Sequence, residues 1–102
     1  MTVNEYQKAA LRTGREDASL LEGVMGLCGE SGECIDIAKK WLYQGHILDR
    51  EHLAEELGDV AWYVAFTAAA IDYPLEKVLQ MNIDKLKKRY PNGFDVERSV
   101  HR

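Results

Sequence analysis

The feature that most constrains the fold of this chain is a long helical repeat of apolar and small residues in its first half. From Ser19 these residues follow one another at alternating steps of four and three: Leu20, Val24, Leu27, Ser31, Cys34, Ala38 and Trp41. A second series runs beside the first: Leu21, Met25, Cys28, Gly32 and Ile35. Because a helix with two apolar sides must be covered from two directions, the repeat predicts a central helix in an all-α fold.

Caps and helix breakers predict the other elements of a four-helix, bundle-like fold. Asn4 is a plausible N-cap for the first helix, Asp49 for the third, and Pro74 suits the start of the fourth. The expected ranges are residues 4–12, 19–43, 49–71 and 74–90. At 102 residues the chain is expected to form a single domain, with a core at about residues 20–90. Residues 91–102 are expected to form an arm that lies on the surface or on a neighbouring subunit.

Two features of the predicted helices indicate close packing against something else. The run Val60–Ile71 has no charge on any side, so a single bundle would struggle to cover it, and a homo-dimer or homo-tetramer is expected. Three glycines, Gly26, Gly29 and Gly32, each weaken the central helix by about 1 kcal/mol relative to alanine. This cost suggests that another helix or a ligand approaches the backbone there.

Two pairs of carboxylates lie within these apolar segments. Glu30 and Glu33 are three residues apart in the central helix, and Glu56 and Asp59 are three apart in the third. A three-residue step turns a helix by about 300°, so each pair projects from nearly one face. Four acids close together among apolar neighbours would either hold protons or gather around a cation. The pattern predicts a divalent metal site.

The alternatives to this metal site stay open from the pattern alone. A single Glu-x-x-Glu step usually lies on a solvated helix face. If a metal is bound, ligands that are all oxygen favour Mg²⁺ or Mn²⁺ over zinc, and the lack of a Glu-x-x-His pair argues against a di-iron bundle. Glu55 could be a further ligand, a residue behind the ligands or a solvated residue.

Cationic and aromatic side chains could serve a phosphorylated ligand. Asn82, Lys85 and Arg89 share one face of the fourth helix, and an amide with two cations suits a phosphate chain. Lys85 and Arg89 could instead only stabilise the helix C-terminus. Lys40, or its neighbour Lys39, could reach a phosphate, although solvated lysines are more usual. Three aromatic residues could stack on a base, but packing in the core is the commoner role at helical spacing: Trp41, Trp62 and Tyr63.

The composition excludes several other classes of protein. A net charge of −4 argues against a protein that coats a nucleic acid polymer. Cys28 and Cys34 point to different sides of their helix, and free thiols fit a reducing compartment. The N-terminus lacks the apolar run of a signal peptide, and no segment is expected to span a membrane. A cytoplasmic protein is therefore expected.

These residues resemble the MazG-like nucleotide pyrophosphohydrolases of the all-α NTP pyrophosphatase superfamily. The resemblance is carried by Gly-Glu-Ser-Gly-Glu, by Glu-Glu-Leu-Gly-Asp-Val-Ala-Trp-Tyr and by Asn-Ile-Asp-Lys-Leu-Lys-Lys-Arg-Tyr-Pro-Asn-Gly-Phe, within residues 20–98. It implies an oligomeric enzyme that hydrolyses a nucleoside triphosphate to the monophosphate and pyrophosphate. A role in clearing non-standard or excess nucleotides would follow. The residues that this implies for Mg²⁺ are Glu30, Glu33, Glu56 and Asp59.

The resemblance also implies roles for the remaining candidates. Lys85 and Arg89 would contact phosphates, and Asn82 a phosphate or the sugar. One of the metal-binding acids, or Glu55, would accept a proton from the attacking water; the sequence does not choose between them. Two other readings remain: a non-catalytic helical module that binds a nucleotide or a protein, and a related pyrophosphatase that acts on dCTP, dUTP or phosphoribosyl-ATP.

Overall fold

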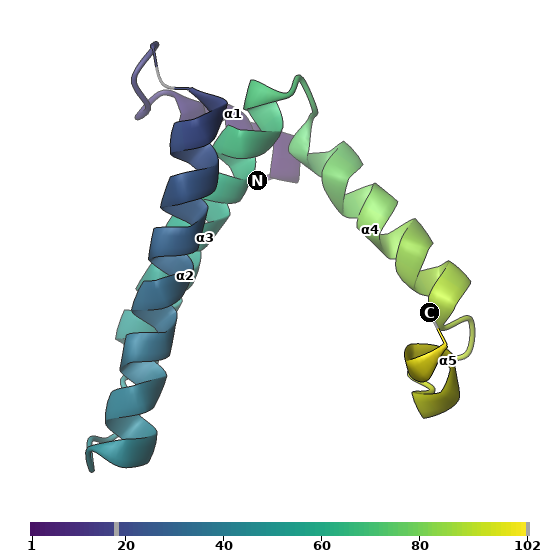
Figure 1. Cartoon of the computed structure of the whole chain (residues 1–102). Helices are drawn as coiled ribbons and strands as arrows, with labels where there is room; N and C mark the ends of the chain where they lie inside the picture. Colours follow the sequence, from purple (N-terminus) through teal and green to yellow (C-terminus); the bar gives the residue numbers. More distant parts are fainter. Residues whose placement is uncertain (18, 102) are drawn as a thin grey trace.

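Two long helices, α2 (Leu20–Tyr43) and α3 (Arg50–Ala70), form an antiparallel hairpin that is the spine of the fold (Figure 1). The computed structural model describes residues 1–17 and 19–101. The side chains of Ser19 and Asp49 cap the two helices by accepting hydrogen bonds from backbone N–H groups three residues on. The capping role of Asp49 is the one that the sequence predicts. Gly45, with φ of +72°, turns the chain between them.

The first helix, α1 (Val3–Leu11), begins two residues earlier than a cap at Asn4 would allow. Thr2 is the N-cap, and its side chain and that of Glu5 form a reciprocal capping box. The prediction that Asn4 caps this helix is therefore wrong. Asn4 instead contacts the start of the fourth helix, where its side-chain oxygen accepts a hydrogen bond of 3.0 Å from the backbone N–H of Glu76. Pro74, which precedes that helix, supplies no side-chain cap of its own.

A buried glutamine fixes where the fourth helix, α4 (Leu75–Arg89), leaves the hairpin. The Gln7 side chain, 8% exposed, donates hydrogen bonds to the carbonyl oxygens of Ala65 (3.1 Å) and Tyr73 (3.2 Å). Its own oxygen accepts a bond of 2.8 Å from the N–H of Leu75. One side chain of α1 thus ties together α3, the following turn and the start of α4.

Beyond this point α4 diverges from the hairpin, so that the chain has the shape of an inverted V (Figure 1). The radius of gyration is 16.6 Å, whereas a closed domain of this length would have about 13 Å. The all-α class is confirmed, but α4 does not complete a four-helix bundle within one chain. The predicted arm contains a short helix, α5 (Val96–Val100), and Arg98 there donates a hydrogen bond of 3.4 Å to the backbone oxygen of Arg89.

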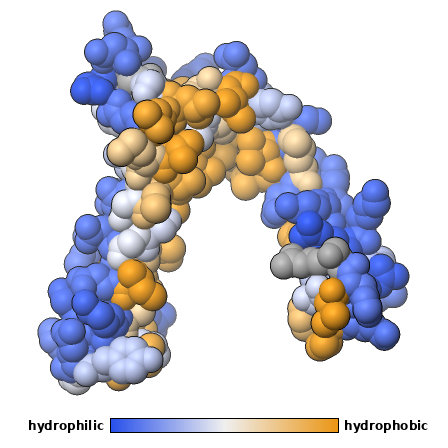
Figure 2. Space-filling view, viewed as in Figure 1, coloured by the Kyte–Doolittle hydropathy of each residue, from blue (hydrophilic) through white to orange (hydrophobic). Residues whose placement is uncertain are grey.

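Few large side chains are buried in a single chain. The buried apolar residues are Ala10, Ile37, Ala65, Phe66, Ala68 and Leu75, and none of the described large side chains is fully enclosed. The uncharged run Val60–Ile71 is covered in part by α1, and apolar residues gather on the inner side of the V near its apex (Figure 2). Within the described residues, no helix combines the length and apolar character needed to cross a bilayer.

Candidate metal centre

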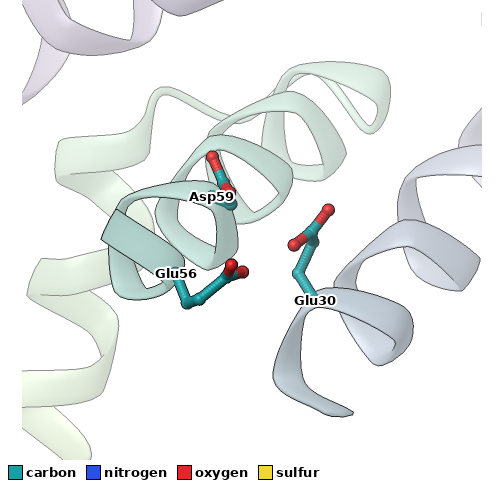
Figure 3. A group of neighbouring side chains, drawn as sticks. All are labelled: Glu30, Glu56 and Asp59. Atoms are coloured by element: carbon teal, nitrogen blue, oxygen red, sulfur yellow. The ribbon is translucent and has the colours of Figure 1, made fainter. Parts of the chain in front are cut away.

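Three carboxylates from the two helices of the hairpin converge on one another (Figure 3). Glu30 comes from α2, and Glu56 and Asp59 come from α3. Each offers one oxygen atom, and these three atoms lie within 4.8 Å of one another. The antiparallel arrangement produces this grouping, because it sets the middle of α2 opposite the first half of α3. These residues are called the acid cluster below.

The two carboxylate oxygens of Glu56 have different surroundings. Its side chain is only 15% exposed, and one carboxylate oxygen lies 3.2 Å from Nε2 of His52. The other oxygen, Oε2, is buried and has no hydrogen-bond partner in the described part of the chain. An ionised oxygen left without a partner is costly, and a divalent cation bound at the cluster would satisfy it. The chemistry of these donors therefore fits Mg²⁺ or Mn²⁺.

The pKa of Glu30 is raised by its surroundings in the acid cluster. Partial burial, the largest cause, raises the pKa of its carboxyl above the ordinary value, and the carboxylates of Asp59 and Glu56 raise it further. Without a cation, the cluster relieves its repulsion by holding a proton on Glu30 to a higher pH. A bound cation would compete with that proton.

The structure does not bring every predicted acid into the cluster. Glu33 is exposed one turn beyond Glu30, and its charge makes a smaller contribution to the raised pKa of Glu30. Glu55 is exposed beside Glu56 on α3. The roles predicted for Glu33 as a ligand and Glu55 as a proton acceptor stay predictions.

The predicted phosphate-binding residues lie elsewhere. Nζ of Lys40 is 3.1 Å from Asp36, and this hydrogen bond is the main reason that the pKa of the Asp36 carboxyl is lowered. Asn82 and Lys85 are exposed and Arg89 is half-buried in the second half of α4, the part that diverges from the hairpin. Within one chain the structure therefore does not bring these three residues to the acid cluster.

Two features beside the cluster were not predicted. A hollow of about 340 Å³ is lined by two of the acids, by Trp62 and Tyr63 from α3, and by Thr13 from the turn after α1. The second feature is His52, an exposed residue of α3 whose Nε2 lies 3.2 Å from Oε1 of Glu56. The spacing of four between His52 and Glu56 is a sequence signal that could have indicated this contact. Nothing near Thr13 in the sequence indicates its position.

An all-α hairpin with a carboxylate cluster between its helices defines a class of protein that can hold a divalent cation. The chain belongs to the MazG nucleotide pyrophosphohydrolase domain family, which matches residues 18–94. It is similar to the gene 37 protein of Mycobacterium phage L5, with 42% identity over 105 residues that cover 91% of this chain and 92% of the relative. That relative's name states no activity. No solved structure matches the chain significantly.

Proposed function

We propose that this protein is a Mg²⁺-dependent enzyme that hydrolyses a nucleoside triphosphate to the monophosphate and pyrophosphate, acting in the cytoplasm. The observation that carries the proposal is the buried, unpartnered Oε2 of Glu56 within the acid cluster. Membership of the MazG family supports the reaction type. Mn²⁺ would fit the same oxygen ligands.

In this proposal, different residues of the hairpin bind the cation and accept the proton. Glu30, Glu56 and Asp59, joined by Glu33 if its side chain turns inward, would hold the cation. When bound, Mg²⁺ neutralises the charge of the phosphate oxygens and lowers the pKa of the attacking water. In the reaction water attacks one of the two phosphorus atoms that flank the α–β bridging oxygen, the bond from that phosphorus to the bridging oxygen breaks, and the monophosphate and pyrophosphate separate. Glu55, or one acid of the cluster, would accept the water's proton.

Phosphate binding by the cationic face of α4 requires a second copy of the chain. Asn82, Lys85 and Arg89 suit a polyphosphate, yet within one chain α4 diverges from the hairpin that carries the acids. Charge complementarity favours an arrangement in which the α4 of one copy lies against the hairpin of another. Lys40, which is held by Asp36, would reach a phosphate only if it left that ion pair.

The apolar inner side of the V supports a homo-oligomer independently of the charges. A hollow of about 390 Å³ near the apex is lined by α1, α3 and α4, with Tyr6, Val64 and Leu79 among its walls. Leu79 is 44% exposed. Soluble proteins rarely leave such a continuous apolar surface open, and a second copy of the chain would cover it. We therefore propose a dimer or tetramer.

A substrate panel with detection of pyrophosphate tests the activity. The purified protein is assayed with ribo-, deoxy- and modified nucleoside triphosphates, with and without Mg²⁺, beside Glu56→Gln, Asp59→Asn and the remote control Glu97→Gln. We expect release of pyrophosphate by the wild-type protein and by the control only. Nucleotide binding without hydrolysis would instead support a non-catalytic module. Turnover of a single nucleotide, such as dCTP or dUTP, would identify a specialised pyrophosphatase.

Mixing two inactive variants tests whether the site forms between copies. Glu56→Gln lacks a metal ligand and Lys85→Ala lacks a phosphate contact, so each homo-oligomer should be inactive. If α4 acts on a neighbouring copy, exchange of subunits in a two-fold dimer restores about a quarter of the wild-type activity. If each chain used its own α4, the mixture would stay inactive.

A further inference from the structure

We infer that the outer face of α2 is a contact surface for a second copy of this chain, with the two α2 helices packed antiparallel about Cys28. The outer face is the side of α2 that points away from α3. Its residues follow one another at helical spacing: Leu21, Val24, Met25, Cys28, Ser31, Gly32 and Ile35. This surface is separate from the inner side of the V, and it takes no part in the proposed reaction.

The outer face is apolar and uncovered in a single chain. α2 packs on α3 through its opposite side, where Ile37 is buried, and Figure 1 shows α2 at the edge of the molecule, away from α4. At about 100° per residue, Ile37 and Cys28 point in opposite directions. The three largest side chains of the face, Leu21, Met25 and Ile35, are 66%, 64% and 69% exposed. Contiguous apolar surface of this kind indicates a protein contact.

The outer face can be covered without leaving a buried polar group unpaired. The Oγ of Ser31 already donates a hydrogen bond of 2.8 Å to the backbone oxygen of Leu27. Cys28 is a free thiol, and a free thiol behaves as a small apolar group. The remaining side chains of the face are apolar, so a partner helix that covers them pays no penalty for an unpaired donor or acceptor.

The order of large and small residues fits a second α2 in antiparallel orientation. If a two-fold axis passes beside Cys28, each residue before Cys28 lies opposite the residue that is equally far after it in the other copy. The opposed residues are Val24 and Gly32, Met25 and Ser31, and Leu21 and Ile35. In the first two pairs a large side chain meets a small one, so the helices can approach closely at the centre. In the third pair two large side chains meet at the ends, where crossing helices are further apart.

The charges beside the outer face favour the antiparallel orientation over the parallel one. Arg15 and Glu22 form an ion pair of 2.6 Å near the start of α2, and Lys40 and Asp36 form one of 3.1 Å near its end. In a parallel pair each of these groups would meet the same group of the other copy. In an antiparallel pair the first ion pair lies beside the second, and the macrodipoles of the two helices also oppose each other. Charge complementarity therefore identifies a second copy of this chain as the occupant.

Cross-linking with a short bis-maleimide tests the contact in the full-length protein without nucleotide. Cys34→Ser leaves Cys28 as the single thiol, and we expect a covalent dimer because Cys28 lies opposite its own counterpart. The control carries Ile47→Cys in a background with both native cysteines replaced by serine. Ile47 is exposed in the turn between α2 and α3. A yield from Cys28 no greater than that of the control would overturn the inference.

Two further cysteine variants test the orientation. Leu21→Cys and Ile35→Cys are made separately in the cysteine-free background and then co-expressed, with a tag on one so that the mixed dimer has its own size. In an antiparallel pair, cysteines of the same variant lie about 21 Å apart along the helix axes, whereas those of different variants lie opposite each other. We expect a product from the co-expressed pair and little from either variant alone. A high yield from one variant alone would refute the antiparallel orientation.

Sedimentation velocity measures the consequence for assembly. A chain that uses both the inner side of the V and the outer face of α2 forms a tetramer, and loss of either contact leaves a dimer. We expect Met25→Lys to halve the mass of the assembly and the matched control Ile47→Lys to keep it. Circular dichroism should show unchanged helix content in both, because both side chains are exposed in a single chain. The combination of Met25→Lys with Leu79→Lys should be monomeric.

These measurements separate the outer face from the other proposals. A wild-type mass for Met25→Lys would overturn the inference, whether or not the protein hydrolyses a nucleotide. If the wild-type protein is a dimer that Met25→Lys makes monomeric, the outer face stands and the contact through α4 is refuted.

Discussion

Substituting one central glycine should reveal how tightly the two helices of the hairpin meet. A Cβ atom placed on Gly26 would lie 2.0 Å from Cε1 and 2.3 Å from Cζ of Tyr63, far inside van der Waals contact. Gly29 lies three residues after Gly26 on the same helix, and a Cβ atom placed on it would have nothing within 4 Å. The pair Gly26→Ala and Gly29→Ala therefore differs in contact but not in the type of substitution or in the helix.

The expected magnitudes follow from two opposing terms. Alanine in place of glycine inside a helix adds about 1 kcal/mol of stability, and this gain applies to both variants. Overpacking against a fixed ring costs about 1–3 kcal/mol, and this cost applies at Gly26 only. The difference between the two variants isolates the overpacking cost. We expect Gly29→Ala to raise the Tm by about 4–8 °C and Gly26→Ala to lie below it by at least that amount.

Thermal unfolding followed by circular dichroism at one fixed protein concentration measures this difference, because assembly makes the Tm depend on concentration. Equal Tm values for the two variants would refute the close approach of Tyr63 to α2. An independent check comes from activity, since Tyr63 must shift to admit the new methyl group and it lines the hollow beside the acid cluster. Gly26→Ala should therefore raise KM for nucleotides, whereas Gly29→Ala should not.

Three further results are expected. His52→Ala removes the partner of one Glu56 oxygen and should lower Mn²⁺ affinity at least tenfold, measured by calorimetry; unchanged affinity would contradict a role in orienting the ligand. The raised pKa of Glu30 means that, at pH values between its unfolded and folded pKa, the native state binds more protons than the unfolded chain. The free energy of unfolding of the metal-free protein should therefore fall as the pH rises through this range. The affinity for Mn²⁺ should rise over the same range, because the cation no longer competes with a proton on Glu30. Glu30→Gln should abolish both trends, as titrations of stability and binding would detect. Leu79→Lys should dissociate the oligomer in sedimentation velocity, whereas Met81→Lys, about 200° round α4, should not.

The α2–α3 hairpin could be predicted because the residues that form its helices and turn interact with near neighbours in the sequence. The helical repeat, the Asp49 cap and the glycine-containing turn each depend on residues that are close together in the sequence. The acid cluster can be predicted from the same local patterns. Each acid pair lies on one face of its helix, and a short connecting turn sets the two helices antiparallel, so the two faces can lie opposite each other. Of the four acids predicted to bind the metal, Glu33 lies outside the cluster, because it is exposed one turn further along α2.

The direction of α4 could not be predicted, because it depends on contacts between distant parts of the sequence. Asn4 and Gln7 hold the start of α4 from about seventy residues away, through side-chain bonds to backbone groups that have no sequence signature. Asn4 does not cap its own helix, and its side-chain oxygen instead accepts a hydrogen bond from the backbone N–H of Glu76 in the first turn of α4. The predicted close approach at three glycines is confirmed at Gly26, while Gly29 and Gly32 face open space in a single chain.

The division of the candidate site between two parts of the chain has a consequence for how assembly affects activity. The acid cluster lies wholly within the α2–α3 hairpin, so one chain supplies all three of its carboxylates. Asn82, Lys85 and Arg89 lie on α4. This helix diverges from the hairpin after its first residue, Leu75, whose N–H donates a hydrogen bond to the Gln7 side chain. Metal affinity should therefore be the same in monomer and oligomer. Turnover, which also requires cations on the phosphate chain, should fall on dilution as the subunits separate. We therefore expect assembly to control turnover through the placement of α4 rather than through the metal.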